Sequence, residues 1–341
     1  MQKILIVTAE NGWFAQGKFP WESMDIERIK RRLESNNKIV NVTTFQFLKD
    51  NIASLKDYII IYTSSQRLEH KYYIQDIMFL LKDNNTLIPN YESLLAHENK
   101  GFQSLLDKKY NLGLIKSEYY CDICEVKNIK NLNYPLVYKS VNGASSMGVK
   151  KVHNTEEMYK YVKQPCSISL ELLKRKLKKY IFKSKYNHQW EKYLSFAQQR
   201  FIIQGFIPDL QYDFKVLIFG KKYYLLKRFV AENDFKASGS GLHSRNIGSD
   251  LKIVLDFARG IKNKFRSHIY SLDICVKNKE PHLIEFQMTH VGPVTLSESD
   301  HYFIYNATTN NWEKVFSLSS LEDEFSNAVE EYINESDSYS A

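Results

Sequence analysis

Short apolar runs alternate with helical patterns over about the first 90 residues, and this alternation constrains the fold more than any other feature of the sequence. The apolar runs are Lys3–Ala9, Lys38–Val42, Tyr58–Thr63 and Leu87–Pro89. Runs of this kind are typical of parallel strands that are buried on both faces. The pattern therefore predicts a parallel α/β domain over residues 1–92, in which the loops Asn11–Gly17 and Ser64–Arg67 lie at the ligand-facing carboxyl ends of strands.

The composition is that of an ordinary globular protein. The 341 residues include 43% hydrophobic and 25% charged side chains, which indicates about two or three domains. The 47 basic and 39 acidic residues give a net charge of +8, which favours an anionic partner such as a nucleotide, a sugar phosphate, a lipid headgroup or a nucleic acid. No apolar run approaches the about 20 residues of a membrane helix, and the first residues lead into a strand pattern, so we expect a cytoplasmic location.

Two strand-like runs near the C-terminal end lie on either side of the loop sequence KNKEP and carry the strongest local argument. The second run is Pro281–Thr289. Alternation along it is expected to place Leu283, Glu285 and Gln287 on the same face. In a hairpin that pairs Val276 with His282, the two strands run antiparallel from that pair. Asp273 then lies directly opposite Glu285, with Cβ atoms about 5 Å apart.

Two ionised carboxylates at this distance repel each other by about 3 kcal/mol at an effective dielectric constant near 20, so the pair needs a compensating charge. A divalent cation is one remedy, because Asp273, Glu285 and the amide oxygen of Gln287 are hard oxygen ligands that suit Mg²⁺. The alternatives are a shifted register, or an arginine or lysine that neutralises the pair. Periodicity alone leaves these alternatives open.

A second candidate element is the loop Asn142–Gly148, which joins two strands of a predicted hairpin. Its glycines and serines would let backbone N–H groups approach phosphate oxygens, although a plain turn has the same composition. Lys139 precedes the loop on an apolar strand and is placed to meet an α- or β-phosphate. The chain contains neither the GxxxxGK[ST] nor the GxGxxG motif, so a nucleotide must be held in another way.

Seven segments in order carry a resemblance to a known family. They are HENK ending at Lys100, PLVYKSVNGASSMGV, IIQGFI, YDFKVLIFG, LLKRF, SLDI and LIEFQMTHVGP. This order, from Pro89 to Gly292, resembles the ATP-grasp superfamily of carboxylate-amine ligases. The resemblance implies an α/β fold, α+β in its C-terminal part, with a parallel N-terminal domain, a small lid domain and an antiparallel C-terminal sheet.

The domain boundaries implied by the resemblance follow the same order. The N-terminal domain would span residues 1–92, and the ATP-grasp core would span 93–133 and 208–333. The lid would span 134–207 and include a strongly basic helical insertion at about 165–199. Residues 334–341 would form a frayed tail.

The resemblance also implies that the chain binds ATP and Mg²⁺. Lys100 and Lys139 correspond to the lysines that contact the phosphates. The loop that closes over the β- and γ-phosphates corresponds to Gly143, Ser145, Ser146 and Gly148. The hinge that reads the adenine edge corresponds to Gln204, Gly205, Phe206 and Ile207, and the residue on the ribose hydroxyls to Asp209.

The implied metal ligands are Asp273 and Glu285, with Gln287 at a position where the family usually has asparagine, which puts a second Mg²⁺ in doubt. The cations expected against the γ-phosphate and the acyl phosphate are Arg228 and Lys215. Arg245, in the glycine-rich loop Gly239–Gly248, is a further candidate.

The function implied by the resemblance is an ATP-dependent ligase that couples the carboxylate of a small metabolite or sugar acid to an amine. The alternatives are a small-molecule kinase on the same fold, or a basic nucleic-acid or membrane-surface adaptor with a degenerate nucleotide site. The expected partners are small acids and amines rather than nucleic acid. A peripheral membrane contact through the basic stretch and a homo-oligomer both remain open.

Overall fold

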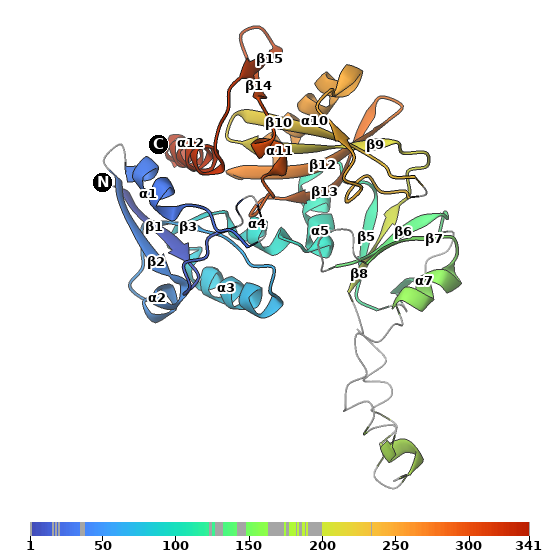
Figure 1. Ribbon diagram of the computed structural model, residues 1–341. Helices are drawn as coiled ribbons and strands as arrows, with labels where there is room; N and C mark the ends of the chain where they lie inside the picture. The colour runs from blue at the N-terminus through green and yellow to red at the C-terminus, as the bar shows by residue number, and fades with distance from the viewer. Residues whose placement is uncertain are drawn as a thin grey trace. The chain divides into compact units, whose positions relative to one another are not determined.

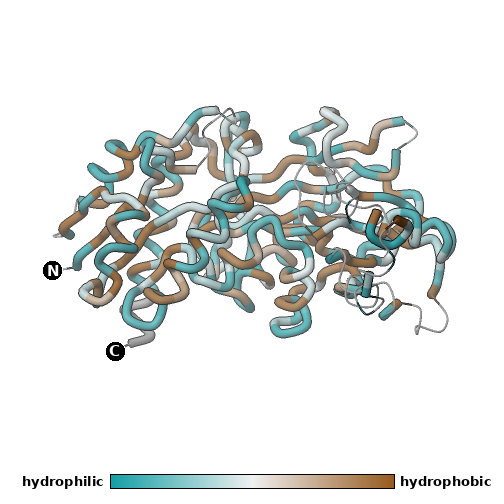
Figure 2. The backbone as a smooth tube through the Cα atoms, turned by 90° about the horizontal axis from the view of Figure 1, so that it is seen from below, coloured by the Kyte–Doolittle hydropathy of each residue, from teal (hydrophilic) through white to brown (hydrophobic). Residues whose placement is uncertain are grey.

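The computed structural model describes the chain except for residues 1, 16, 18, 20, 35–37, 123–124, 127–131, 142–147, 163–173, 175–176, 182, 184–185, 188, 190–199, 233 and 341. The chain divides into two compact units. Unit 1 comprises residues 1–114 and 209–341, and unit 2 comprises residues 115–208. Hydrophobic and hydrophilic stretches alternate along the chain (Figure 2), as expected where each element has one buried and one exposed face.

The N-terminal part of unit 1 is a four-stranded parallel sheet, as predicted (Figure 1). Its strands, in the order β2-β1-β3-β4, are β1 (Gln2–Thr8), β2 (Lys38–Thr44), β3 (Tyr58–Tyr62) and β4 (Thr86–Ile88). The helices of this part are α1 (Ile26–Glu34), α2 (Phe45–Asp50), α3 (Leu68–Leu81), α4 (Tyr91–Ala96) and α5 (Lys100–Tyr110). Residues Ile4–Val7 of β1 are almost fully buried, which explains their continuous apolar pattern.

The C-terminal part of unit 1 is built on a seven-stranded sheet in the order β13-β12-β9-β10-β14-β15, with β11 paired to β10. Its strands are β9 (Tyr212–Phe219), β10 (Lys222–Phe229), β11 (His243–Ser244), β12 (Ile269–Lys277), β13 (Glu280–Gln287), β14 (His301–Asn306) and β15 (Asn311–Phe316). All neighbouring strands are antiparallel. One face of the sheet packs on α10 (Leu251–Lys264), where Phe214, Val216 and Leu272 join a large apolar core.

The hairpin of β12 and β13 differs from its predicted register. Val276 pairs with Pro281 rather than with His282, and the register shifts by one residue between Asp273 and Ile274. The shift is a β-bulge at Ile284, and it restores the predicted pairing of Asp273 with Glu285. The bulge also moves Leu283 away from the face of Glu285, and Leu283 joins Phe286 in the core instead. The expectation that Leu283 shares a face with Glu285 is therefore wrong.

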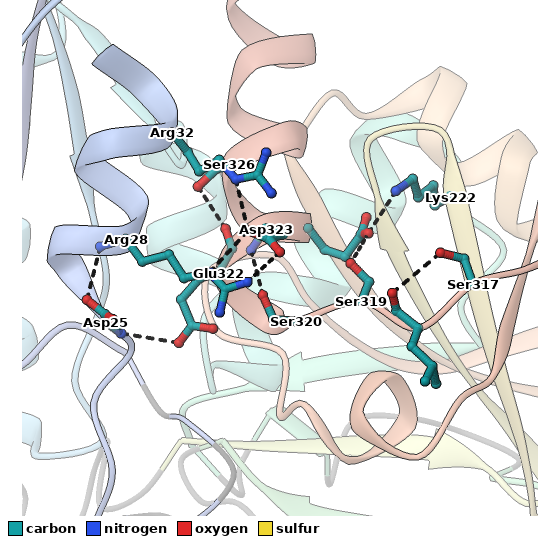
Figure 3. Close-up of polar contacts among 12 residues, drawn as sticks. Asp25, Arg28, Arg32, Lys222, Ser317, Ser319, Ser320, Glu322, Asp323 and Ser326 are labelled. Carbon is teal, nitrogen blue, oxygen red and sulfur yellow. Dashed lines mark hydrogen bonds and ion pairs between the residues drawn. The ribbon is translucent and has the colours of Figure 1, made fainter. Parts of the chain in front are cut away.

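A long helix, α12 (Leu321–Ser340), ends the described chain and packs against α1. Figure 3 shows Asp323 at this contact, where it accepts from Arg28 at 2.6 Å and from Arg32 at 3.0 Å. The helix continues through residues 334–340, where the sequence predicts a frayed tail. Neither glycine nor proline follows Ile333, so nothing in the sequence stops the helix there.

Unit 2 contains a four-stranded antiparallel sheet and, among its described residues, a helix that follows β7. Its strands, in the order β5-β8-β6-β7, are β5 (Ser117–Tyr120), β6 (Leu136–Ser140), β7 (Val149–Val152) and β8 (Phe201–Gly205). Helix α7 (Thr155–Val162) begins after Asn154, whose side chain accepts from the backbone N–H of Glu157 at 2.9 Å. This unit includes residues 115–133, which the resemblance assigns to the core, because β5 pairs with β8.

Two short helical segments complete unit 1, η2 (Gly248–Asp250) and α11 (Val294–Ser297). Most of the basic stretch 165–199 lies outside the described residues. None of the described helices combines the length and the apolar character that are needed to cross a membrane.

Candidate active site

A row of charged side chains crosses the face of the seven-stranded sheet that lies opposite α10. Asp273 on β12 has Glu285 as its partner on β13 and Lys215 as its partner on β9. Arg228 on β10 is the partner of Asp213, two residues before Lys215 on β9. Because cross-strand partners project from the same face, four neighbouring strands bring these five residues together.

Three ion pairs connect this row around Asp273. Lys215 Nζ lies 3.0 Å from Asp273 Oδ1, and Arg228 Nη2 lies 2.9 Å from Asp273 Oδ2. The Arg228 guanidinium also binds Asp213 through two hydrogen bonds, of 2.7 and 2.8 Å, in the bidentate geometry that favours arginine over lysine. The side chains of Arg228 and Asp273 are 16% and 15% exposed, so water screens this pair only weakly.

The pKa values of the two aspartates move in opposite directions. Burial disfavours the charged form of Asp273, but Arg228 and Lys215 outweigh burial and hold its pKa below the usual range. Burial raises the pKa of Asp213 to about 6, because its attraction to Arg228 only partly offsets the loss of solvation. Asp273 is therefore a carboxylate at neutral pH, as a cation ligand must be.

Glu285 and Gln287 extend the row on β13. Lys100 Nζ lies 3.5 Å from Glu285 Oε1, and Gln287 Nε2 donates to the same oxygen at 3.4 Å. Gln287 Oε1 accepts from the backbone N–H of Glu98 at 3.1 Å and lies 3.1 Å from His97 Nδ1. In this structure the amide oxygen predicted to bind metal is thus engaged by two protein groups.

The donor set fits Mg²⁺ held by two carboxylates. Asp273 and Glu285 are hard oxygen ligands on adjacent strands, and Mg²⁺ commonly takes one or two carboxylates, with water and phosphate completing its shell. The Ser271 hydroxyl, next to Asp273 on the same face, is buried and has no hydrogen-bond partner among the described residues. The described part of the chain contains no group of three or more His, Cys, Asp or Glu placed to hold a metal ion. Lys215 and Arg228 form ion pairs with Asp273, and Lys100 forms one with Glu285. The cationic neutralisation named above as an alternative is therefore also present.

Unit 2 contains the other predicted lysine and part of the predicted loop. Lys139 is buried on β6, paired in register with Val149 of β7. Gly148 has a φ of +78°, and a Cβ there would overlap the hydroxyl of Ser140, so both the backbone and the neighbouring side chain favour glycine. Gly143, Ser145 and Ser146 lie outside the described residues.

The predicted adenine-reading segment follows directly from strand β8. The Gln204 side chain is buried and donates to Ser117 Oγ at 3.0 Å, while the Gly205 backbone N–H donates to the carbonyl of Lys116. The Phe206 ring lies 4.2 Å from Lys151 Nζ, and Ile207 follows it outside the strand. Asp209, predicted for the ribose, belongs to unit 1 and has a φ of +57°.

Arg245 lies elsewhere on unit 1 and contacts the segment that follows α11. It donates to Ser299 Oγ at 2.8 Å and lies 3.3 Å from Glu298. It also lines an open hollow of about 540 Å³ together with His301 and Lys314. Among the described residues, the hydrogen-bond and ion-pair partners of Arg245 are thus Ser299 and Glu298, and it does not take part in the ion pairs of Asp273.

A pocket of about 330 Å³ lies at the carboxyl ends of β1 and β3, and we call it the β1–β3 pocket. Its lining comes from the two loops that were predicted to face a ligand, together with α3, His97 and His290. Its polar and aromatic lining residues include Asn11, Trp13, Ser64, Arg67, His97 and His290.

Comparisons with known proteins place this geometry in a fold family. A family model described as D-ala D-ala ligase C-terminus matches residues 112–173. A search of curated protein sequences gives no significant match to the chain. Many solved structures match, and three of them, two synthetases and one ligase, illustrate the result.

A D-cycloserine synthetase is 10% identical, with a TM-score of 0.52 over 97% of this chain and 99% of that one. The N5-carboxyaminoimidazole ribonucleotide synthetase of Thermotoga maritima is 12% identical, with a TM-score of 0.51 over 88% and 73%. The L-amino acid ligase of Bacillus licheniformis is 11% identical, with a TM-score of 0.50 over 87% and 70%. The chain has the ATP-grasp fold. The predicted fold class is thereby confirmed.

Two residues in and beside the charged row, Asp213 and Lys71, were not predicted from the sequence. Asp213 shares a face with Lys215 by simple alternation, so its spacing could have revealed it. Lys71 is buried and binds Glu98 at 3.2 Å and the carbonyl of His97 at 3.3 Å, which fixes the segment HENK beside Gln287. No local pattern marks Lys71, because its partners lie 26 and 27 residues away.

Proposed function

We propose that this chain is an ATP-dependent ligase that joins a carboxylate to an amine and releases ADP and phosphate. The observation that supports it best is the Asp273–Glu285 pair, flanked by Lys100, Lys215 and Arg228 on one sheet face. Three cations beside two metal-type carboxylates suit a polyphosphate, whose charge has to be spread during phosphoryl transfer. The ATP-grasp fold, shared with C–N ligases, supports the same reaction class.

In the proposed site the protein supplies charge and position rather than a covalent intermediate. Mg²⁺ bound by Asp273 and Glu285 would neutralise phosphate oxygens and hold ATP for attack. The ion pairs of Asp273 keep Lys215 and Arg228 at this face before ATP arrives. With Mg²⁺ held by the two carboxylates, the positive charges of Lys215 and Arg228 would be available to phosphate oxygens.

The proposed reaction has two steps. An oxygen of the substrate carboxylate attacks the γ-phosphorus, the bond from that phosphorus to the bridging oxygen breaks, and ADP leaves with the bonding electrons. The amine nitrogen of the second substrate then attacks the acyl carbon, phosphate leaves with the carbon–oxygen bond pair, and the nitrogen loses a proton. Lys215 and Arg228 would stabilise the negative charge on the transferring group in both steps.

The β1–β3 pocket supports a small substrate. Its volume of about 330 Å³ is at the lower end of small-molecule sites, which suits a metabolite or a sugar acid rather than a polymer. The pocket reaches His97, whose Nδ1 lies 3.1 Å from Gln287 Oε1, so one end adjoins the charged row. We also propose a cytosolic location, which fits the exposed thiol of Cys121.

An ADP-release assay across panels of carboxylic acids and amines tests the proposed function. Purified protein should release ADP only when Mg²⁺, an acid and an amine are all present, and mass analysis should find an amide. Asp273→Asn should lower the rate at least about 100-fold, as the loss of a main electrostatic group does. The matched control is Asp50→Asn. Asp50 is an exposed residue of α2, and it forms an ion pair with the adjacent Lys49.

Other outcomes of the same assay would contradict the ligase proposal. A stable phosphorylated product that forms without any amine would identify a kinase instead. Full ADP release by the Asp273→Asn protein would remove the acidic pair from the mechanism. Absence of Mg²⁺-dependent ATP affinity, together with salt-sensitive binding to nucleic acid or anionic vesicles, would favour the adaptor alternative.

A further inference from the structure

A basic helical turn in unit 2 has no role in the proposed phosphoryl transfer. Residues 177–180 are helical, and the backbone N–H of Ile181 donates to the carbonyl of Leu177 at 2.8 Å, which closes the turn. Lys174, three residues before Leu177, is also helical, and Lys183 follows the turn. We call the described residues 174, 177–181 and 183 the basic turn.

Three large apolar side chains of the basic turn face solvent. Leu177 is 44% exposed, Tyr180 is 70% exposed and Ile181 is 63% exposed. Their spacing of three and four residues puts them on one side of the helical turn. Single exposed apolar side chains are common on protein surfaces, whereas neighbouring ones on one side mark a contact with an apolar partner.

Lysines accompany this apolar side. Lys178 and Lys179 lie within the turn, and Lys174 and Lys183 stand before and after it. Lys174, Lys178 and Lys183 are exposed, and none of the three forms an ion pair with a carboxylate among the described residues. The sequence from Lys174 to Gln189 contains neither aspartate nor glutamate. The basic turn is therefore a positive surface that attracts an anionic partner.

The apolar side chains distinguish among anionic partners. A nucleic acid places its phosphates against lysines and stacks its bases on aromatic rings, but it offers no apolar surface to the aliphatic Leu177 and Ile181. The interface of a lipid bilayer accommodates both kinds of side chain. Aliphatic and tyrosine side chains enter the acyl boundary, and lysine stems reach from there to the headgroups.

We propose that the basic turn binds the anionic surface of a lipid bilayer, with Leu177, Tyr180 and Ile181 at the acyl boundary and the lysines against headgroup phosphates. A contact of this size is peripheral, reversible and sensitive to salt. Cytoplasmic leaflets carry anionic lipids, so the contact agrees with the proposed cytosolic location. It goes beyond the proposed ligase function and does not depend on it, because the basic turn shares no residue with the charged row.

Flotation of the full chain with vesicles, in the absence of ATP, measures the association. The probe is a vesicle of phosphatidylcholine with about 30% phosphatidylglycerol, and vesicles of phosphatidylcholine alone are the uncharged control. The protein should float with the anionic vesicles at low salt, and at least about tenfold more weakly at about 1 M NaCl, where charges are screened. Equal binding to neutral vesicles, or no binding to anionic ones, would overturn the proposal.

A double variant and a matched control assign the binding to the named lysines. Lys174→Gln with Lys178→Gln should weaken binding to anionic vesicles by about 25-fold, which is about fivefold for each lysine near an anionic surface. Lys56→Gln with Lys160→Gln removes the same charge from exposed positions outside the basic turn and should bind as the unaltered protein does. Equal losses in both double variants would show that net charge alone brings the protein to the surface.

Two further variants test the apolar contact. Ile181→Ser should weaken binding by about threefold or more, because it removes apolar area that enters the acyl boundary. Tyr180→Trp adds a fluorescent reporter, and lipids brominated on their acyl chains should quench its emission beyond the quenching seen in the unaltered protein. A Tyr180→Trp protein that binds anionic vesicles without this added quenching would contradict apolar insertion.

Competition and turnover separate this proposal from its rivals. Single-stranded DNA or polyglutamate that binds through Lys174 and Lys178, while anionic vesicles do not bind, would assign the basic turn to a nucleic acid or to an acidic peptide instead. Lys174→Gln with Lys178→Gln should release ADP at the unaltered rate with soluble substrates. If no acid and amine support turnover but the basic turn still binds anionic vesicles, the ligase function fails and the membrane contact stands.

Discussion

Arg228 and Asp273 form a partly buried ion pair of 2.9 Å although β9 separates their strands. The same guanidinium binds Asp213 with two further hydrogen bonds, so one arginine links two carboxylates on different strands. Both attractions raise the pKa of Arg228 further against the opposing effect of burial. This arrangement makes Arg228 the central cation of the charged row.

Replacement of Arg228 by methionine should lower the free energy of unfolding by about 3–5 kcal/mol, because it leaves the buried Asp213 without its bidentate partner and the partly buried Asp273 with Lys215 alone. Urea unfolding monitored by circular dichroism measures this change. The control is Arg28→Met on α1, which removes the pair with Asp323 drawn in Figure 3. Because the Arg28 side chain is 43% exposed, its loss should change stability little. Equal effects of the two substitutions would contradict a buried, weakly screened role for Arg228.

Replacement of Gly148 by alanine should destabilise the β6–β7 hairpin, and the loss of stability should exceed the cost of left-handed backbone strain alone. The left-handed backbone costs a residue with a side chain about 1–2 kcal/mol, and the added Cβ would also overlap the Ser140 hydroxyl. Gly241 has a similar φ of +74° with no atom within 4 Å of an added Cβ, so Gly241→Ala measures strain alone. Hydrogen exchange of the β6 amides should report local opening in Gly148→Ala only. The double variant with Ser140→Ala should recover part of the loss, and no recovery would disprove the overlap.

Much of the fold could be predicted from hydrophobic periodicity. Continuous apolar runs identified the buried parallel strands, and alternation identified the pair of β12 and β13 and the facing acids Asp273 and Glu285. The side of the sheet on which Leu283 lies could not be predicted, because a β-bulge leaves no signature in a pattern of period two. The bulge is settled by the core beneath the sheet, where Leu283 and Phe286 are both buried.

The partners of the site residues were less predictable than their positions. Arg228 and Asp273 meet because the order β12-β9-β10 brings together strands that are distant in the sequence. The amide oxygen of Gln287 is engaged by His97 and Glu98, which lie 190 and 189 residues away. Such contacts depend on tertiary packing, so local spacing could suggest a metal ligand but could not show which group takes its oxygen.

Replacement of His268 by phenylalanine should reduce the loss of stability in acid. His268 is buried against Phe325 and Tyr332, neither ring nitrogen has a partner among the described residues, and burial lowers its pKa to about 3. Below pH 6.5 the unfolded chain binds a proton that the folded protein excludes, so falling pH favours unfolding down to about pH 3.

Between pH 8 and pH 5 this one histidine should cost the unaltered protein about 2 kcal/mol of stability, a loss that His268→Phe should avoid. Urea unfolding of both proteins at the two pH values gives the difference directly. Since phenylalanine can keep the packing with Phe325 and Tyr332, the variant should fold normally at pH 8. Parallel pH dependences in the two proteins would show that His268 gains a proton acceptor or solvent access in the folded state.

Replacement of Glu285 by glutamine should raise the Mg²⁺ concentration that supports ATP binding. Glutamine keeps the length of the side chain but removes one of the two charges of the Asp273–Glu285 pair, and Lys100 loses its ionic partner at 3.5 Å. A loss of about 1.4 kcal/mol in cation affinity corresponds to a tenfold rise in the half-saturating Mg²⁺ concentration. Titration of Mg²⁺ at fixed ATP, followed by calorimetry or ADP release, measures this half-saturating concentration.

Glu280→Gln, at the exposed opposite end of the same strand, is the matched control and should leave the Mg²⁺ dependence unchanged. If Glu285→Gln and Glu280→Gln gave the same curve, Glu285 would serve only as the ionic partner of Lys100.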